Sequence, residues 1–179
     1  MLRCFVAIPF PTEIKKHFKS IYKFLSQNKN LKIVSLENLH ITLKFLGNIQ
    51  ESMVNKIDSI LSSINYTSFN ISFKNPGVFL NRGKPKVFFI NIFSDSLKNI
   101  TLLIDNKLEM LGFKKDDRDF RPHLTLARVK GFIDKSFTQT FLDYKIEEIS
   151  FKVVNFVLYK SDLRPEGPIY TELRSYKLY

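Results

Sequence analysis

The stretches LHITL at 39–43 and PHLTL at 122–126 carry the same pattern, a histidine followed by threonine two residues later and then by leucine. The chain has only three histidines, and the two in this pattern lie almost half of the 179-residue chain apart. A repeat at this spacing predicts two similar halves that each contribute one short strand.

The spacing within each copy predicts which side chains act together. On a β-strand, side chains two residues apart point to the same face, so His40 shares a face with Thr42, and His123 shares one with Thr125. The alternating positions are apolar, namely Leu39, Ile41, Leu43, Leu124 and Leu126. Each strand is expected to bury its apolar face in its own half and to present an imidazole and a hydroxyl to a cleft between the halves.

Two imidazoles that meet across a cleft are suited to phosphoester cleavage. One neutral ring can take a proton from water while one protonated ring gives a proton to the leaving oxygen, and the ordinary histidine pKa of about 6.5 makes both states accessible near neutrality. The hydroxyls of Thr42 and Thr125 can hold nonbridging phosphate oxygens. Nothing in this arrangement needs a cofactor. His17 has no threonine partner and is expected to be structural.

Composition narrows the class of protein and its partner. The net charge of +11 favours a polyanion such as nucleic acid or a nucleotide, although abundant Lys, Asn, Ile and Phe are also what AT-rich coding produces. The single cysteine, Cys4, excludes an internal disulfide framework and a Cys-based zinc site, which favours the cytosol. No apolar run approaches the roughly 18 residues of a spanning helix, and the stretch MLRCFVAIPFP at 1–11 does not read as a secretory signal.

Apolar periodicity predicts interspersed helices and strands. Helical spacing covers about 12–25, 51–64 and 96–111, with Gly112 ending the third helix. Runs of β-type residues lie at 3–8, 39–45, 69–73, 86–93, 121–129, 149–159 and 169–178. The stretch NRGKP at 81–85 predicts a turn between two strands, with Arg82, Lys84 and Lys86 forming a basic tip.

The two repeated stretches and their neighbours resemble the sequence signatures of a known family. HITLKFLG at 40–47 and RDFRPHLTLAR at 118–128 resemble the paired signatures of the 2H phosphoesterases, in particular the RNA 2′,3′-cyclic phosphodiesterases historically called 2′-5′ RNA ligases. Similar family segments match RCFVAIPFP at 3–11, KPKVFFINI at 84–92 and LYKSDLRPEGPIYTEL at 158–173. The resemblance therefore covers almost the whole chain.

The resemblance implies an α+β fold with two lobes and pseudo-twofold symmetry, in which antiparallel-rich sheets face a central groove and helices lie outside. Residues 1–179 are then a single 2H phosphoesterase domain of two similar intertwined lobes, with one His-x-Thr strand each at 39–45 and 121–127. The implied reaction is hydrolysis of a terminal RNA 2′,3′-cyclic phosphate to a 2′-phosphate, without metal or cofactor. His40 would be the general acid that protonates the departing 3′ oxygen, and His123 the general base that activates water.

The resemblance also assigns four binding residues. Thr42 and Thr125 are implied phosphate ligands, Arg128 matches an arginine near the phosphate, and Phe45 matches an aromatic residue that stacks on the terminal base. The alternation of side chains along a strand argues against these roles for Arg128 and Phe45. Each lies five residues after its histidine, so in an ideal strand it points away from the cleft, and its role requires a β-bulge or the end of the strand. Core packing of Phe45 and a surface ion pair for Arg128 are the alternatives.

Other functions remain open at this level. The same residues suit a smaller cyclic phosphate, such as a cyclic nucleotide or an ADP-ribose cyclic phosphate, the reverse 2′-5′ joining reaction, or a non-catalytic module that binds RNA or a nucleotide. The acidic residues Asp116, Asp117 and Asp119 are expected to form a solvated loop rather than a metal site. We expect a cytoplasmic monomer, not bound to membranes, that acts on RNA ends, including tRNA fragments, without an obligate protein partner.

A set of basic residues flanks the two motifs and the turn between strands. It would either line the mouth of the groove and grip the RNA backbone or lie scattered over the surface. The set comprises Arg82, Lys84, Lys86, Arg118, Arg121 and Lys130.

Overall fold

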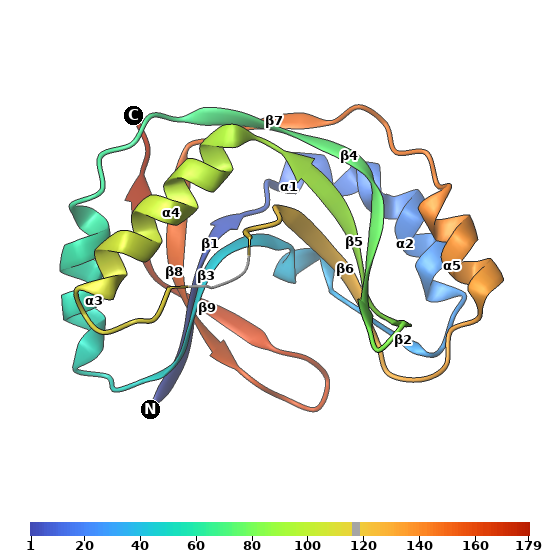
Figure 1. Ribbon diagram of the computed structural model, residues 1–179, viewed down its shortest axis with the longest axis horizontal. Coiled ribbons are helices and arrows are strands. Elements are labelled where there is room, and N and C mark those ends of the chain that lie inside the picture. The colour runs from blue at the N-terminus through green and yellow to red at the C-terminus, as the bar shows by residue number, and fades with distance from the viewer. Residues whose placement is uncertain (116–118) are drawn as a thin grey trace.

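Strands that are apolar on one face must bury that face, and here they do so in two separate sheets, both entirely antiparallel (Figure 1). This computed structural model describes residues 1–115 and 119–179. The first sheet has the order β3 (His40–Ile49), β1 (Leu2–Pro9), β8 (Asn155–Asp162), β9 (Ile169–Lys177). The second has the order β2 (Leu31–Ile33), β6 (His123–Val129), β5 (Lys84–Phe93), β4 (Phe69–Asn81), β7 (Ser150–Val153).

Helices cover the outer faces of the two sheets (Figure 1). Helices α3 (Met53–Ser62) and α4 (Asp95–Glu109) pack on the first sheet, and α2 (Lys19–Ser26) and α5 (Lys135–Leu142) pack on the second. Short turns of helix complete the chain: α1 (Thr12–Lys15), η1 (Lys16–Phe18) and η2 (Leu36–Asn38). The expected α+β fold, with two lobes and helices outside, is confirmed.

Several expected elements differ in detail. The helix expected over 12–25 is divided by the 3₁₀ turn η1, and the two His-x-Thr strands begin at their histidines and run to 49 and 129. The short elements β2 and α5 were not expected. The run expected as one strand over 149–159 is two strands, β7 and β8, which belong to different sheets.

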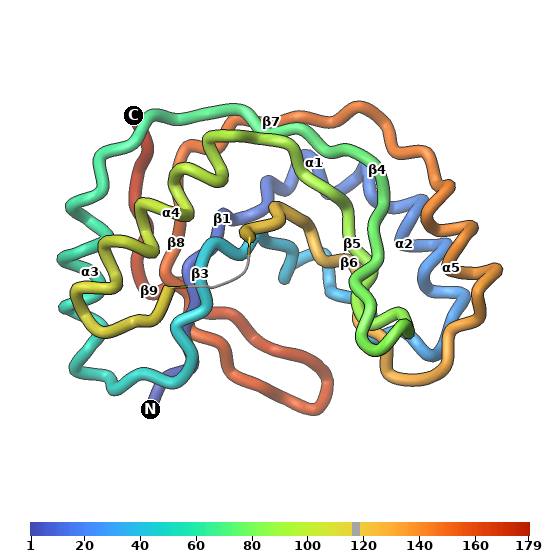
Figure 2. The backbone as a smooth tube through the Cα atoms, viewed as in Figure 1, coloured from blue at the N-terminus to red at the C-terminus, as the bar shows by residue number. Residues whose placement is uncertain are grey.

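The chain crosses between the sheets at Val154, the half-exposed residue between β7 and β8. Figure 2 shows this crossing as the orange backbone at the top of the view. It also crosses between β1 and β2, between β2 and β3 and between β3 and β4, so each sheet combines segments from distant parts of the sequence. One continuous cluster of buried apolar side chains reaches both sheets, which allows the two lobes to share a core.

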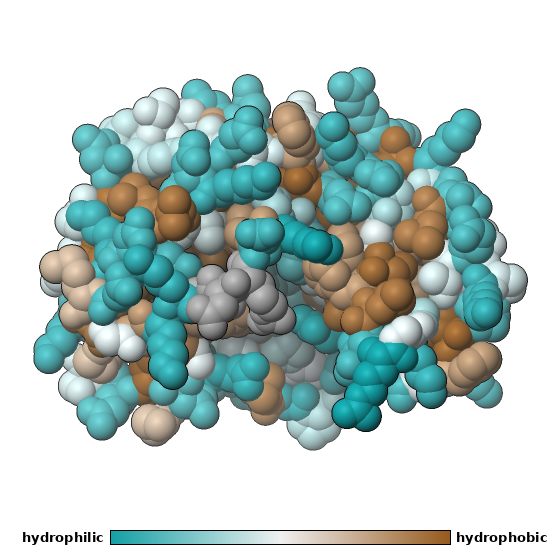
Figure 3. All heavy atoms as spheres, in the orientation of Figure 1, coloured by the Kyte–Doolittle hydropathy of each residue, from teal (hydrophilic) through white to brown (hydrophobic). Residues whose placement is uncertain are grey.

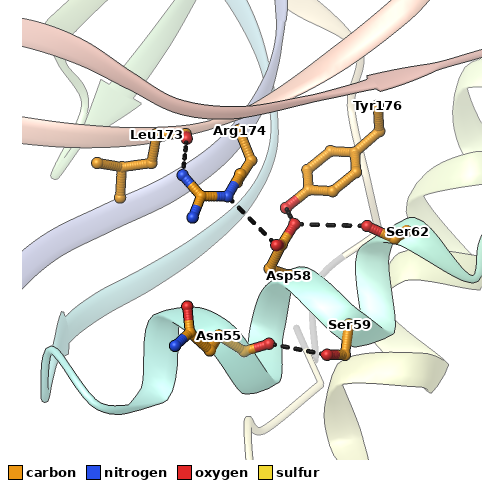
Figure 4. A network of polar contacts seen from close by, with 7 residues as sticks. All are labelled: Asn55, Asp58, Ser59, Ser62, Leu173, Arg174 and Tyr176. Atoms are coloured by element: carbon orange, nitrogen blue, oxygen red, sulfur yellow. Dashed lines mark hydrogen bonds and ion pairs between the residues drawn. The ribbon is translucent and has the colours of Figure 1, made fainter.

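A polar network fixes α3 against the first sheet (Figure 4). The carboxylate of Asp58 accepts hydrogen bonds from the Tyr176 hydroxyl at 3.0 Å and from Arg174 Nε at 3.2 Å, both from β9, and from the Ser62 hydroxyl at 3.4 Å. Because two donors of β9 converge on one carboxylate of α3, helix and sheet are held in a defined orientation; the Ser62 contact lies within the helix. No helix in the described part of the chain is long and apolar enough to span a membrane.

Candidate active site

The two repeated histidines occupy equivalent places, each at the first residue of its strand, β3 or β6. His40 Nδ1 lies 2.7 Å from the backbone carbonyl oxygen of Asn38, and His123 Nδ1 lies 2.7 Å from that of Arg121. A carbonyl oxygen only accepts hydrogen bonds, so each Nδ1 carries a proton and donates it. The nitrogen that gains and loses a proton is therefore Nε2 in both rings.

Aromatic side chains of the first sheet surround His40. The ring of Phe5 lies 4.9 Å from the imidazole, and that of Tyr170 meets it edge-on at 5.1 Å. Tyr159 stacks on Phe5 at 5.3 Å and extends this aromatic surface across β8. The pKa of His40 is lowered, chiefly because burial disfavours the charged ring.

His123 has its own aromatic wall in the second sheet. Phe79 lies 4.9 Å away and Phe89 5.3 Å away, both edge-on to the imidazole, and these two phenyl rings stack on each other at 4.1 Å. Burial is the main cause that lowers the pKa of His123. The wall depends on Gly77, the cross-strand partner of Phe89, since a Cβ atom at residue 77 would lie only 2.5 Å from the Phe89 ring.

A β-bulge interrupts each His-x-Thr strand at the same offset from its histidine. Ala7 pairs with Thr42 but Val6 pairs with Lys44, so β3 carries one extra residue at Leu43. In β6 the corresponding extra residue follows Thr125, three residues after the histidine, as at Leu43. A bulge shifts the alternation of side chains by one, so the residue five places after each histidine returns to the face of that histidine.

Phe45 and Arg128 are the two residues that the bulges turn. Phe45 is 62% exposed and its ring lies 6.4 Å from Phe5, the residue that contacts His40. Arg128 is exposed, and its positive charge lowers the pKa values of His40 and His123. The buried alternative for Phe45 is wrong, and no described carboxylate lies within ion-pair distance of Arg128.

Charge effects act between the two sheets at this point. The charge of His123 lowers the pKa of His40, because two positive rings near one another repel. Arg128 of β6 likewise acts on Tyr170 of β9, whose pKa burial raises and this cation lowers. Strands β3 and β6 are in contact, and the two histidines head them. Because these positive charges repel one another, His40 and His123 together favour the state in which one ring is protonated over the state in which both are.

The bulge in β3 turns Lys44 to the helix side, where its side chain is only 5% exposed. Its ammonium forms an ion pair with Asp105 of α4 at 2.5 Å and donates to the backbone carbonyl oxygen of Lys114 at 2.6 Å. A buried ammonium requires such partners, so this contact holds the bulge in place. The equivalent residue in β6 is Ala127, which is fully buried and needs no partner.

The remaining predicted residues are distributed as follows. Thr42 and Thr125 are half-buried beside their histidines, and in the described structure neither hydroxyl makes a hydrogen bond. His17 lies far away in η1, where its Nδ1 is 2.9 Å from Glu147 Oε2. Asp119 is exposed, whereas Asp116, Asp117 and Arg118 lie outside the described residues. No group of three or more His, Cys, Asp and Glu residues that could hold a metal ion occurs within 1–115 and 119–179.

Comparison with known proteins identifies the family. The model of the LigT-like phosphoesterases matches residues 8–89 and 93–170. The chain belongs to this family. Two curated relatives are named RNA 2′,3′-cyclic phosphodiesterase: one from Methanocaldococcus jannaschii is 39% identical over 98% of this chain and 100% of its own length, and one from Archaeoglobus fulgidus is 35% identical over 98% and 100%.

Solved structures of LigT-like folds superimpose on the chain. A Thermus thermophilus protein gives a TM-score of 0.87 at 24% identity over 98% of this chain and 97% of its own. The crystal structure of E. coli LigT complexed with 3′-AMP gives a TM-score of 0.77 at 22% identity over 99% of this chain and 98% of its own. These likenesses confirm the fold expected for a LigT-like phosphoesterase, and the family match and the curated names agree with the expected enzyme class, a phosphodiesterase.

Sequence reasoning missed the residues that surround the histidines in this LigT-like site. Phe5, Phe89 and Tyr170 lie within segments that resemble the family but received no role, and Gly77 and Phe79 lie outside those segments; the fold brings each of the five to a histidine or to its aromatic wall. For Phe5 and Phe89 the available signal was a position in β1 or β5, the strands that pair with the two motif strands, whereas β9 and β4, which carry the other three residues, do not pair with them.

Proposed function

We propose that this protein hydrolyses the terminal 2′,3′-cyclic phosphodiester of RNA to a 2′-phosphomonoester by two-histidine acid–base catalysis that needs no metal ion. The observation that carries the proposal is the matched pair of Nδ1 contacts. Both rings are fixed through Nδ1, which assigns proton exchange to Nε2 in each. The names of the curated relatives support the substrate.

The reaction balances with these two rings alone. His123 Nε2, neutral at the start, takes a proton from water as the water oxygen bonds to phosphorus. The bond from phosphorus to the 3′ oxygen breaks, and protonated His40 gives its Nε2 proton to that oxygen. The products are a 2′-phosphate and a free 3′ hydroxyl. His123 then holds the proton that His40 lost, and exchange with solvent restores the starting state.

The electrostatics support a pair that holds one proton. Arg128 and the mutual repulsion of the rings both disfavour the doubly protonated state. Acid–base catalysis requires one protonated and one neutral ring, so this is the reactive state. The Arg128 guanidinium and the Thr42 and Thr125 hydroxyls are proposed to bind the nonbridging oxygens, where negative charge develops in the transition state.

Phe45 is proposed to hold the terminal base. Its ring is exposed, lies on the face of His40 and adjoins the Phe5 ring. An exposed aromatic ring offers a base a stacking surface worth roughly 1–3 kcal/mol, and it does so for any base because every base has a π face. The substrate class is then RNA ends of varied sequence.

The test uses an oligoribonucleotide ending in a 2′,3′-cyclic phosphate, incubated in excess EDTA, with the product identified by phosphorus NMR. We expect a 2′-phosphate, and we expect His40→Ala and His123→Ala each to lower turnover by about 10²- to 10⁴-fold while the fold is kept. A 3′-phosphate product, a requirement for added metal, or a loss below about tenfold in either variant would each contradict the proposal.

The pH dependence provides a second test of the same pair. The pKa values of both free rings are lowered, so the protonated acid disappears as pH rises above the lowered value. We expect kcat/KM, which reports the free enzyme, to depend on pH with a bell-shaped profile whose decrease at high pH begins below about pH 7. A flat profile from pH 5 to 9 would exclude a histidine pair.

A further inference from the structure

A basic cavity lies at the end of β6 that is remote from His123. Its volume is about 390 Å³, and four of the eight lining residues are cations while none is acidic. The cations are Arg82, Lys84, Lys86 and Lys130. All four are exposed, and within the described structure none of them has an ion-pair partner. Figure 3 shows hydrophilic side chains gathered over this tip of the β4–β5 hairpin, beside a hydrophobic area over the same two strands.

The turn that carries one of these cations is strained. Asn81 pairs with Lys84, which leaves Arg82 and Gly83 as a two-residue hairpin loop. Both have positive φ, 49° at Arg82 and 74° at Gly83, and Arg82 is the one non-glycine residue with this conformation among those described. Asn-Gly is the favoured pair for such a turn. Arginine at this position lowers stability, and it places a cation at the mouth of the cavity.

The cavity continues directly from the site. Its lining begins at Val129, the residue after Arg128, and Lys86 precedes Val87, the cross-strand partner of Arg128. Lys130 lies seven residues after His123, and because the bulge takes up one of these residues, the extended path between them is about 20 Å. Positive charge therefore extends from the histidine pair, through Arg128, to the hairpin tip.

We propose that this cavity binds the backbone phosphates of single-stranded RNA on the 5′ side of the cyclic end. The inference rests on the proposed function, because a cyclic phosphate at the 3′ terminus leaves the rest of the strand to exit in the 5′ direction. A stacked strand rises about 3.4 Å per nucleotide, so a path of about 20 Å is the length of roughly six nucleotides. The enzyme thus distinguishes RNA ends from free cyclic nucleotides by contacts remote from the reaction.

The other hairpin near the site suits this role less well. The loop between β8 and β9 has mixed charge, since it carries both Arg164 and Glu166, and Lys160 of β8 is paired with Asp162 at 3.0 Å. Its backbone is also tied to the second lobe, since the carbonyl oxygen of Pro165 accepts a bond from Lys32 Nζ at 3.3 Å. A polyanion is attracted more strongly to the cavity, whose charged residues are all cations, than to this loop of mixed charge.

An exposed aromatic residue favours a single strand as the occupant. Phe132 follows Gly131 of the cavity lining and is 80% exposed. An unpaired base can stack on such a ring, whereas a base within a duplex cannot reach it.

Binding is measured apart from catalysis by using oligoribonucleotides of two to ten nucleotides that already end in a 2′-phosphate. In the wild-type protein we expect the Kd to fall with length up to about six nucleotides and then to level. One phosphate contact to a single strand changes the slope of log K against log salt by about 0.7, so Arg82→Asn should weaken octanucleotide binding about fivefold at 0.1 M salt. Replacing all four cations should reduce that slope by nearly 3.

Arg82→Asn also separates binding from folding, because asparagine suits the positive φ and should keep or raise the Tm while affinity falls. Lys98→Gln removes the same charge from exposed α4, on the other lobe, and should change neither quantity. Equal Kd values for two and eight nucleotides in the wild type, equal binding of an RNA duplex, or an Arg82→Asn effect no larger than that of Lys98→Gln would overturn the inference. Length-dependent binding without any hydrolysis would uphold this cavity while refuting the proposed reaction.

Discussion

Gly77→Ala should damage the active site without changing any residue that touches the substrate. The added Cβ would lie 2.5 Å from Cε2 and Cζ of Phe89. Carbon atoms in contact need about 3.5 Å, so the ring must move by about 1 Å. It is only 6% exposed and stacks on Phe79, and both rings are edge-on to His123. The displacement therefore passes to the proposed general base.

The magnitude follows from this geometry. Misplacing a reacting group by 1 Å can cost about 10²-fold in rate, and overpacking a buried site costs about 1–3 kcal/mol of stability. We expect kcat on a cyclic-phosphate-ended oligoribonucleotide to fall 10- to 100-fold. Unfolding in denaturant should show a loss of about 1–3 kcal/mol in the free energy of unfolding. Most of the protein remains folded, since domains of this kind have about 5–15 kcal/mol of stability.

Gly112→Ala is the matched control. Its φ of +85° makes alanine strained there, yet no atom of the described residues lies within 4 Å of the added Cβ. It should lose about 1–2 kcal/mol of stability and keep its turnover. If Gly77→Ala retains full activity, or if Gly112→Ala loses as much activity at equal stability, the Phe89 wall does not position His123 and the reasoning is refuted.

Three further predictions concern charge. Arg128→Gln should raise the pKa values of His40 and His123 and move the profile of kcat/KM to higher pH, whereas Arg128→Lys should leave the profile in place; an unmoved profile in Arg128→Gln would contradict the assigned electrostatic effect. Because both folded-state pKa values are lowered, the unfolded chain binds more protons, and the free energy of unfolding should decrease as pH falls below about 6.5, with a smaller decrease when both histidines are replaced by asparagine. Asp58→Asn should weaken the contact with Tyr176 and cost about 1–3 kcal/mol in denaturant unfolding with turnover unchanged, and a large loss of turnover would show that α3 also positions the site.

The sequence was sufficient for features that depend on local periodicity. The parity of His40 with Thr42 and of His123 with Thr125 was predicted, and the structure has this alternation of half-buried and buried residues over the first four residues of both strands. The short strand β2 and the eight-residue α5 escaped prediction because so few residues carry little periodic signal.

Features set by strand pairing could not be predicted. The run at 149–159 reads as one strand, yet it divides at Val154 because its two parts pair with β4 and β1 in different sheets. The aromatic walls also arise from register, as in the pairing of Phe5 with Phe45 and Tyr159. A sequence without aligned relatives contains no direct record of which strands pair.

The two bulges explain how a nearly symmetric pair of strands can support an asymmetric reaction. Each bulge lies three residues after its histidine and turns the fifth residue toward the site. That residue is an aromatic ring on the His40 side and a guanidinium on the His123 side, namely Phe45 and Arg128. Since both imidazoles are held by the same Nδ1 contact, the rings themselves do not assign acid and base. In the proposed mechanism the fifth residues do so, because stacking of the base beside His40 and binding of the phosphate by Arg128 fix which oxygen leaves toward His40.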